Sequence, residues 1–76
     1  MERQKYNKLI LDTLSKLVEK HPDLRFGQIL VNADIIELVP DSNKSTMIAL
    51  DPYYEEPEVT WERMKNNKFV FKELFN

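Results

Sequence analysis

The stretch HPDLRFGQILVNA, residues 21–33, decides how the chain is divided, because it ends one helix and begins another. It contains the only histidine, the only glycine and the first proline of the sequence. Pro22 stops a preceding helix, since the residue before a proline avoids the helical region. Proline is also favoured at the first position of a helix, where Asp23 would meet the positive end of the dipole. The pattern predicts a second helix over residues 23–33.

Residues 2–20, before this stretch, show the periodicity of an amphipathic helix. Apolar side chains and one threonine fall on one face at helical spacing: Tyr6, Leu9, Ile10, Thr13, Leu14, Leu17 and Val18. Leu11 widens this face beyond what one partner helix needs. We therefore expect the first helix to contact two neighbours.

Within residues 23–33, the apolar face consists of Phe26, Ile29, Leu30 and Ala33. Continuing this face would bury Glu37, so the helix is expected to end between residues 32 and 34. Glycine inside a helix costs about 1 kcal/mol relative to alanine. We interpret Gly27 as room for the close approach of another backbone segment or of an aromatic ring, with Tyr53, Tyr54 and Trp61 as candidates.

Residues 35–50 allow two interpretations. The loop sequence PDSNKS, residues 40–45, separates the short apolar runs 35–39 and 47–50. The runs would suit a β-hairpin. The loop lacks the Asn-Gly or Asp-Gly pair of a tight hairpin, however, and two strands alone are marginally stable. An irregular segment is the favoured prediction.

The sequence of residues 51–76 predicts a turn, a third helix and an apolar tail. Residues 51–56 are predicted to form a tight turn or a single helical turn that positions two tyrosines, and residues 57–66 a helix that begins at Pro57. Asn66-Asn67 would end this helix, since Asn tolerates the left-handed conformation. Residues 68–76 fit a helix or a strand. The predicted fold is a single all-α domain of three helices with an irregular middle, and the alternative is α+β with a hairpin at about 35–50.

Composition limits the classes of function. With 11 basic and 13 acidic residues, the formal net charge is −2, which argues against a nucleic-acid binder that needs a basic surface. No apolar run approaches the ~20 residues of a membrane span, and no secretory signal is visible. With no cysteine and one histidine, thiolate and multi-histidine metal sites are excluded within one chain. We expect a cytoplasmic, non-enzymatic protein without cofactor or metal.

Arg25 is the first candidate functional residue. Its guanidinium could offer paired hydrogen bonds to a carboxylate or phosphate of a partner. Alternatively, it could form a structural clasp by pairing with Asp51, Glu55 or Glu56 of the same chain. We favour the clasp, in which Gly27 leaves room for a tyrosine.

Acids and tyrosines are densest at residues 51–58. Charge complementarity and aromatic anchors could make this segment a surface for a basic protein partner. The alternative is a solvated helix start. Together with the start of the second helix, the candidate residues for partner binding or the clasp are Arg25, Gln28, Asp51, Tyr53, Tyr54, Glu55 and Glu56.

The remaining aromatic residues are expected to be core side chains, because a small core needs large groups. In the tail, Phe69, Phe71 and Phe75 become candidates for a homodimer contact if they do not fold back. His21 is expected to interact with a helix end rather than to act as a catalytic base, because no nucleophile motif accompanies it.

Two motifs together resemble a group of small, largely uncharacterised bacterial and bacteriophage proteins. The first motif, Asp-Leu-Arg-Phe-Gly-Gln-Leu-Leu-x-Asn, is matched by residues 23–30 and Asn32. The second, Asp-Pro-Phe-Tyr-x-Glu, is matched by residues 51–56 with Tyr53 in the phenylalanine position. The resemblance covers about half of the chain and implies a small helical protein of phage or mobile-element origin.

The sequence therefore predicts a non-enzymatic interaction module, encoded by a phage or prophage, that binds and modulates a host protein or a defence complex. The alternative is a small nucleic-acid-associated regulator, although neither predicted inner helix is basic.

Overall fold

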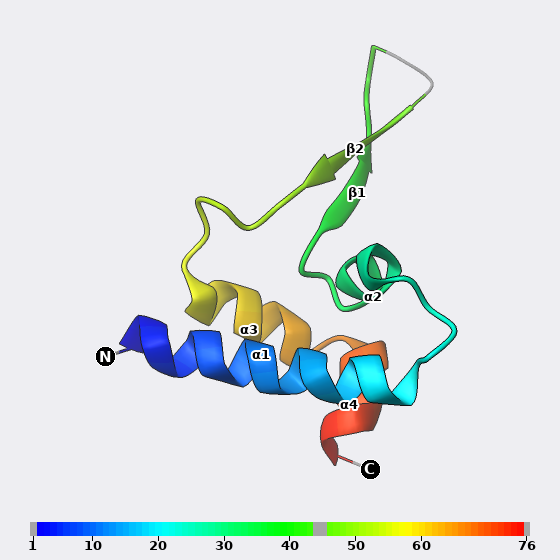
Figure 1. The fold of residues 1–76 in the computed structure, drawn as a ribbon. Helices are drawn as coiled ribbons and strands as arrows, with labels where there is room; N and C mark the ends of the chain where they lie inside the picture. The colour runs from blue at the N-terminus through cyan, green and yellow to red at the C-terminus, as the bar shows by residue number, and fades with distance from the viewer. Residues whose placement is uncertain (1, 44–45, 76) are drawn as a thin grey trace.

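The computed structural model describes residues 2–43 and 46–75, with the side chain of Phe75 excepted. The elements follow one another as α1 (Glu2–Lys20), α2 (Phe26–Asn32), β1 (Glu37–Pro40), β2 (Met47–Leu50), α3 (Pro57–Lys65) and α4 (Lys68–Phe75). The long helix α1 packs against the other three helices. The antiparallel hairpin β1–β2 reaches away from this helical body (Figure 1).

The core is shared evenly among the helices. The largest fully buried side chains are Leu17 of α1, Ile29 of α2, Met64 of α3 and Val70 of α4. Trp61 of α3 is also buried beside them. Each helix therefore contributes to one common core, as expected for a small chain that must bury apolar area efficiently.

The first helix is confirmed over residues 2–20, but its buried face is narrower than predicted. Thr13 and Leu17 are buried, and the Thr13 hydroxyl donates to the Leu9 carbonyl oxygen at 2.8 Å. Leu11 is 63% exposed, so it does not widen the packed face, but the prediction that this helix contacts more than one neighbour is confirmed, because α1 contacts α2, α3 and α4.

The second helix begins at Phe26, three residues later than predicted. Pro22 and Asp23 lie instead in a turn, in which the Leu24 N–H donates to the His21 carbonyl oxygen at 3.1 Å. The helix start is set by Gln28, whose side-chain oxygen accepts from the Arg25 N–H at 2.8 Å. This is half of a capping box. The other half is missing because an arginine side chain has no acceptor.

The end of α2 is a Schellman motif centred on Asp34. The Asp34 N–H donates to the Val31 carbonyl oxygen and the Ile35 N–H to that of Leu30, both at 3.0 Å. Asp34 has a φ of 61° and is the only non-glycine residue of the described chain with a positive φ. The helix thus ends where the sequence predicted, but with aspartate at the position that usually holds glycine.

The middle of the chain corrects the favoured all-α prediction. Strands β1 and β2 pair in antiparallel register, with Glu37 opposite Leu50 and Pro40 opposite Met47. The fold therefore fits the alternative in part, because it is mainly helical but contains a two-stranded hairpin whose strands are Glu37–Pro40 and Met47–Leu50. Asp41 organises the connection, since its N–H donates to the Thr46 carbonyl oxygen and its carboxylate accepts from the Asn43 N–H, both at 3.0 Å. Such an Asx turn does not require the Asn-Gly pair.

The third helix begins at Pro57 as predicted, and the tail forms the fourth helix. Asn66 ends α3 with a φ of −89°, so it is not in the left-handed conformation that its sequence suggested. Asn67 instead begins α4, because its side-chain oxygen accepts from the Val70 N–H at 3.1 Å. The tail packs on α1.

Candidate functional site

The segment of residues 51–56, here called the acidic–tyrosine turn, is locally ordered. The Asp51 carboxylate accepts from the Tyr53 N–H at 2.8 Å, and the Glu55 N–H donates to the Pro52 carbonyl oxygen at 3.0 Å. The side chains of Tyr53 and Tyr54 are 82% and 96% exposed. Their rings meet edge to face with centroids 4.8 Å apart. The turn therefore presents two adjacent aromatic side chains to solvent.

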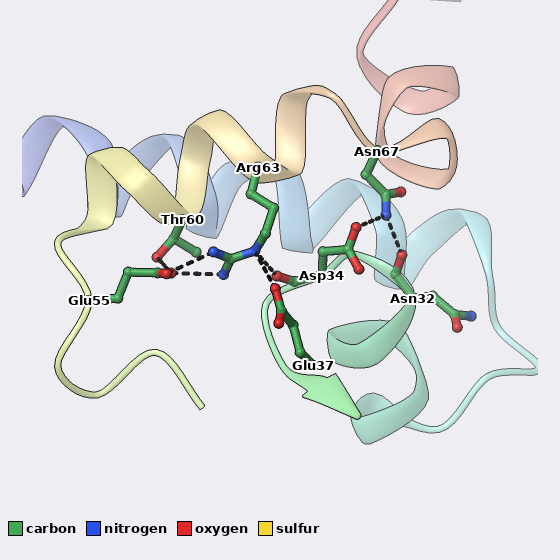
Figure 2. A network of polar contacts seen from close by, with 7 residues as sticks. All are labelled: Asn32, Asp34, Glu37, Glu55, Thr60, Arg63 and Asn67. Atoms are coloured by element: carbon green, nitrogen blue, oxygen red, sulfur yellow. Dashed lines mark hydrogen bonds and ion pairs between the residues drawn. The ribbon is translucent and has the colours of Figure 1, made fainter. Parts of the chain in front are cut away.

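Glu55 is partly buried and its side chain is paired with α3. Its carboxylate accepts from both terminal nitrogens of the Arg63 guanidinium, at 2.7 and 2.8 Å, and from the Thr60 hydroxyl at 2.6 Å. Figure 2 shows this paired contact between the acidic–tyrosine turn and α3. The hydrogen bonds from Arg63 lower the pKa of Glu55 from its ordinary value, although desolvation opposes them.

Arg63 also binds the segment between α2 and β1. Its Nε donates to the Asp34 carbonyl oxygen at 2.7 Å and lies 3.5 Å from a Glu37 carboxylate oxygen. One guanidinium therefore fixes the residues that precede the hairpin and those that follow it (Figure 2). The hydrogen bond to Glu55 is the main reason that the pKa of Arg63 is raised.

Asn67 extends this network to the last helix. Its side-chain nitrogen donates to the Asn32 carbonyl oxygen at 2.9 Å and to the Asp34 carboxylate at 2.6 Å. The hydrogen bond to Asp34 fixes a residue whose left-handed backbone is otherwise unfavourable. Neither Arg63 nor Asn67 was among the candidate functional residues predicted from the sequence. The available signal was a cation placed between the apolar residues Trp61 and Met64, which are both buried.

Glu56 pairs on the surface with the first helix. The Arg3 guanidinium donates to both carboxylate oxygens, at 2.8 and 2.6 Å. The hydrogen bond to Arg3 lowers the pKa of Glu56 and raises that of Arg3. Two of the acids in the acidic–tyrosine turn are therefore neutralised within the chain, which leaves the tyrosines as its most prominent feature.

The predicted clasp between Arg25 and the acidic–tyrosine turn does not form. Within the described residues, Glu55 is paired with Arg63 and Glu56 with Arg3, whereas the Arg25 side chain has no ion pair. The later start of α2 leaves Arg25 as an exposed N-cap residue. A methyl group added at Gly27 would meet nothing within 4 Å, so no tyrosine approaches this glycine.

Arg25 and Gln28 instead line an open groove between α2 and β1. The groove has a volume of about 500 Å³, and its other walls include Leu24, Val31 and Leu38. The structure brings Arg25 and Gln28 together, but α2, which they begin, lies apart from the acidic–tyrosine turn that contains Asp51, Tyr53 and Tyr54 (Figure 1). The candidate residues form two surfaces and not one.

The apolar tail folds back on the helical body. The Phe69 ring stacks on His21 with centroids 4.5 Å apart, and His21 Nε2 lies 3.6 Å from a Glu73 carboxylate oxygen. Phe69 is therefore engaged within the chain, whereas Phe71 is 50% exposed. The Phe75 side chain lies outside the described residues. A homodimer through these residues stays a prediction.

Protein-family models, curated proteins and solved structures give no match to this chain. The resemblance to bacterial and bacteriophage proteins therefore rests on its two motifs alone. In the described part of the chain, no three residues among His, Cys, Asp and Glu are grouped so that they could hold a metal ion. None of the helices described is both long and apolar enough to cross a membrane.

Proposed function

We propose that this chain is a non-enzymatic protein-interaction module that contacts its partner through Tyr53 and Tyr54. The observation that carries the proposal is the nearly complete exposure of both rings on a turn that is held in place. Tyrosine is enriched among the residues that dominate binding energy, because it offers a large apolar ring together with a hydroxyl group.

The anchoring of the turn supports this role. Hydrogen bonds from Arg63 to Glu55 and from Arg3 to Glu56 flank the tyrosines on the C-terminal side, and the Asp51 contact flanks them on the other. A partner would therefore meet side chains whose backbone is already ordered, which lowers the entropic cost of binding. The acids contribute mainly to this order, so the partner needs a pocket for aromatic rings more than a strongly basic face.

The resemblance supports a bacterial setting for this interaction. A small phage- or prophage-encoded protein in the cytoplasm would encounter host enzymes and defence complexes, and binding one of them would modulate its activity. The module would act by occupying a surface, without catalysis of its own.

The test is capture of partners from bacterial lysate on the immobilised chain, quantified by mass spectrometry, followed by titration of the captured protein. We expect the double variant Tyr53→Ser and Tyr54→Ser to bind at least about tenfold more weakly, as for the loss of an aromatic anchor. The matched control replaces two other exposed apolar residues, Leu11→Ser and Val59→Ser, and should bind as wild type.

The proposal is overturned if the control loses binding as strongly as the tyrosine variant, or if the purified chain turns over a substrate. A salt-dependent shift of DNA in a gel would favour the nucleic-acid-associated regulator instead.

A further inference from the structure

The hairpin has two edges, and the edge of β1 lacks one of its outward N–H donors. The Asp41 N–H donates to the Thr46 carbonyl oxygen, so residues 41 and 46 form a hydrogen-bonded pair. Because such pairs alternate along an antiparallel ladder, the outward positions of β1 are Leu38 and Pro40. Proline has no N–H, and Leu38 lines the groove next to α2. A proline on an edge strand is one of the features by which proteins discourage the addition of another strand.

The edge of β2 contains no proline. By the same alternation, the N–H and C=O groups of Met47 and Ala49 point away from β1. Strand β2 reads Met-Ile-Ala-Leu, without charge or proline, and all four of its residues are exposed. Figure 1 shows the hairpin reaching away from the helices, with α2 beside the base of β1. An apolar, uncharged edge of this kind is a template for strand addition.

We propose that β2 pairs with β2 of a second copy of this chain, in antiparallel orientation about a twofold axis, to form the four-stranded sheet β1–β2–β2–β1. In one register, Ile48 lies opposite Ile48 of the second copy and Met47 lies opposite Ala49. This register gives every outward N–H and C=O of Met47 and Ala49 a partner. It also places like faces of the two hairpins on the same side of the sheet, which a twofold axis normal to the sheet requires.

The side chains of β2 favour pairing of its edge with the same strand from a second copy of the chain. Met47 against Ala49 sets a large side chain beside a small one, and Ile48 against Ile48 is a β-branched pair of the kind that stabilises sheets. With no charged residue in β2, self-pairing brings no like charges together. The four-stranded sheet would also remedy the marginal stability of a hairpin whose strands contain no buried residue.

The contact involves one short strand from each copy, so it is smaller than the roughly 1,200–2,000 Å² of a stable protein complex. The dimer is therefore expected to dissociate with a constant of about 10 µM to 1 mM. Sedimentation over this range of concentrations should show monomer at the low end and dimer at the high end.

A cysteine scan tests the register, because the chain contains no cysteine of its own. In the proposed dimer, residues 48 are a non-hydrogen-bonded pair with Cα atoms about 4.5 Å apart, which a disulfide can span. Under mild oxidation, Ile48→Cys should form a covalent dimer at least about tenfold faster than Met47→Cys, whose partner position is offset by two residues. Leu11→Cys, at an exposed site on α1, measures random collision.

A second variant tests the edge without adding a reactive group. Chemical synthesis with N-methyl-Ala49 removes only the outward N–H donor, and the dimer should weaken at least about tenfold while the circular dichroism stays that of wild type. The same N-methylation at Leu11 is unsuitable because it breaks a helix, so Leu11→Lys serves as the control for surface change.

The proposed dimer is contradicted if the wild-type chain sediments as a monomer throughout the concentration range, or if Ile48→Cys cross-links no faster than Leu11→Cys. It is independent of the proposed tyrosine surface. A monomer that keeps its tyrosine-dependent binding would overturn the dimer alone.

Discussion

The helical body and the hairpin are held by different forces. Each of the four helices contributes a fully buried side chain to one core, whereas neither strand of the hairpin contains a buried residue. The body is therefore stabilised by apolar burial, and the hairpin by backbone pairing and by the polar network around Arg63. The difference shows that a hairpin without buried residues can still hold a defined position when both of its ends are anchored to the helical body.

The largest expected effect is loss of core volume in the body. Replacing Met64, which is completely buried, by alanine should lower the free energy of unfolding by about 3 kcal/mol, because transfer energy is lost and a cavity is left. The matched substitution in the hairpin, Ile48→Ala, should cost less than about 1 kcal/mol at low protein concentration. Urea unfolding of both variants measures the difference, and equal losses would contradict the comparison.

Removing Arg63 should have the next largest effect and should act mainly on the hairpin. Arg63→Leu keeps apolar bulk but deletes the hydrogen bonds to Glu55 and Asp34, at a cost of about 2 kcal/mol for partly buried charge-assisted bonds. Amide hydrogen exchange in β1 and β2 should accelerate more than in α1. The control is Arg3→Leu, because the Arg3–Glu56 pair is exposed and its loss should leave the melting temperature unchanged.

Substitutions of Asn67 separate its two roles. Asn67→Ala removes both the cap of α4 and the contacts to Asn32 and Asp34, and should cost about 2 kcal/mol in total. Asn67→Ser keeps an oxygen that can cap the helix, so it should recover about half of this loss. Thermal unfolding decides between the roles, since equal melting temperatures for the two variants would mean that only the contacts to the α2 end matter.

The smallest predicted effect is a loss of stability in acid. The folded-state pKa of Glu55 lies below its ordinary value of 4.5 because Arg63 donates to the carboxylate. The unfolded chain therefore takes up a proton first as the pH falls, so the stabilisation is complete above pH 4.5 and is lost as the pH falls through the lower folded-state value. Glu55→Gln should be less stable than wild type at neutral pH, and the difference should shrink in acid. A constant difference between pH 7 and pH 3 would contradict this assignment.

The sequence predicted the elements whose evidence is local. Helices over 2–20 and from Pro57 follow from apolar spacing and a proline at the start, and the turn at 51–56 follows from Asp51-Pro52. The end of the second helix was also correct, because burying Glu37 was implausible.

The incorrect predictions from the sequence concern places where side chains from distant segments compete for the same partner. Glu55 was available to several cations, and only the packed structure shows that Arg63 reaches it from α3. Likewise, the single glycine suggested a close approach that does not occur, while the left-handed position is taken by Asp34. The hairpin was underestimated because Asp41 forms its turn through a side-chain contact and not through a standard dipeptide.

The placement of Arg63 should allow the sequence between residues 38 and 50 to be replaced. The guanidinium holds Asp34 and Glu37 on one side of the hairpin and Glu55 on the other, so the two points at which the hairpin leaves the body are fixed independently of what joins them. Segments anchored in this way tolerate insertions and replacements, since no core residue is disturbed. The helical body could therefore serve as a scaffold that displays loops of different length and sequence from one defined position.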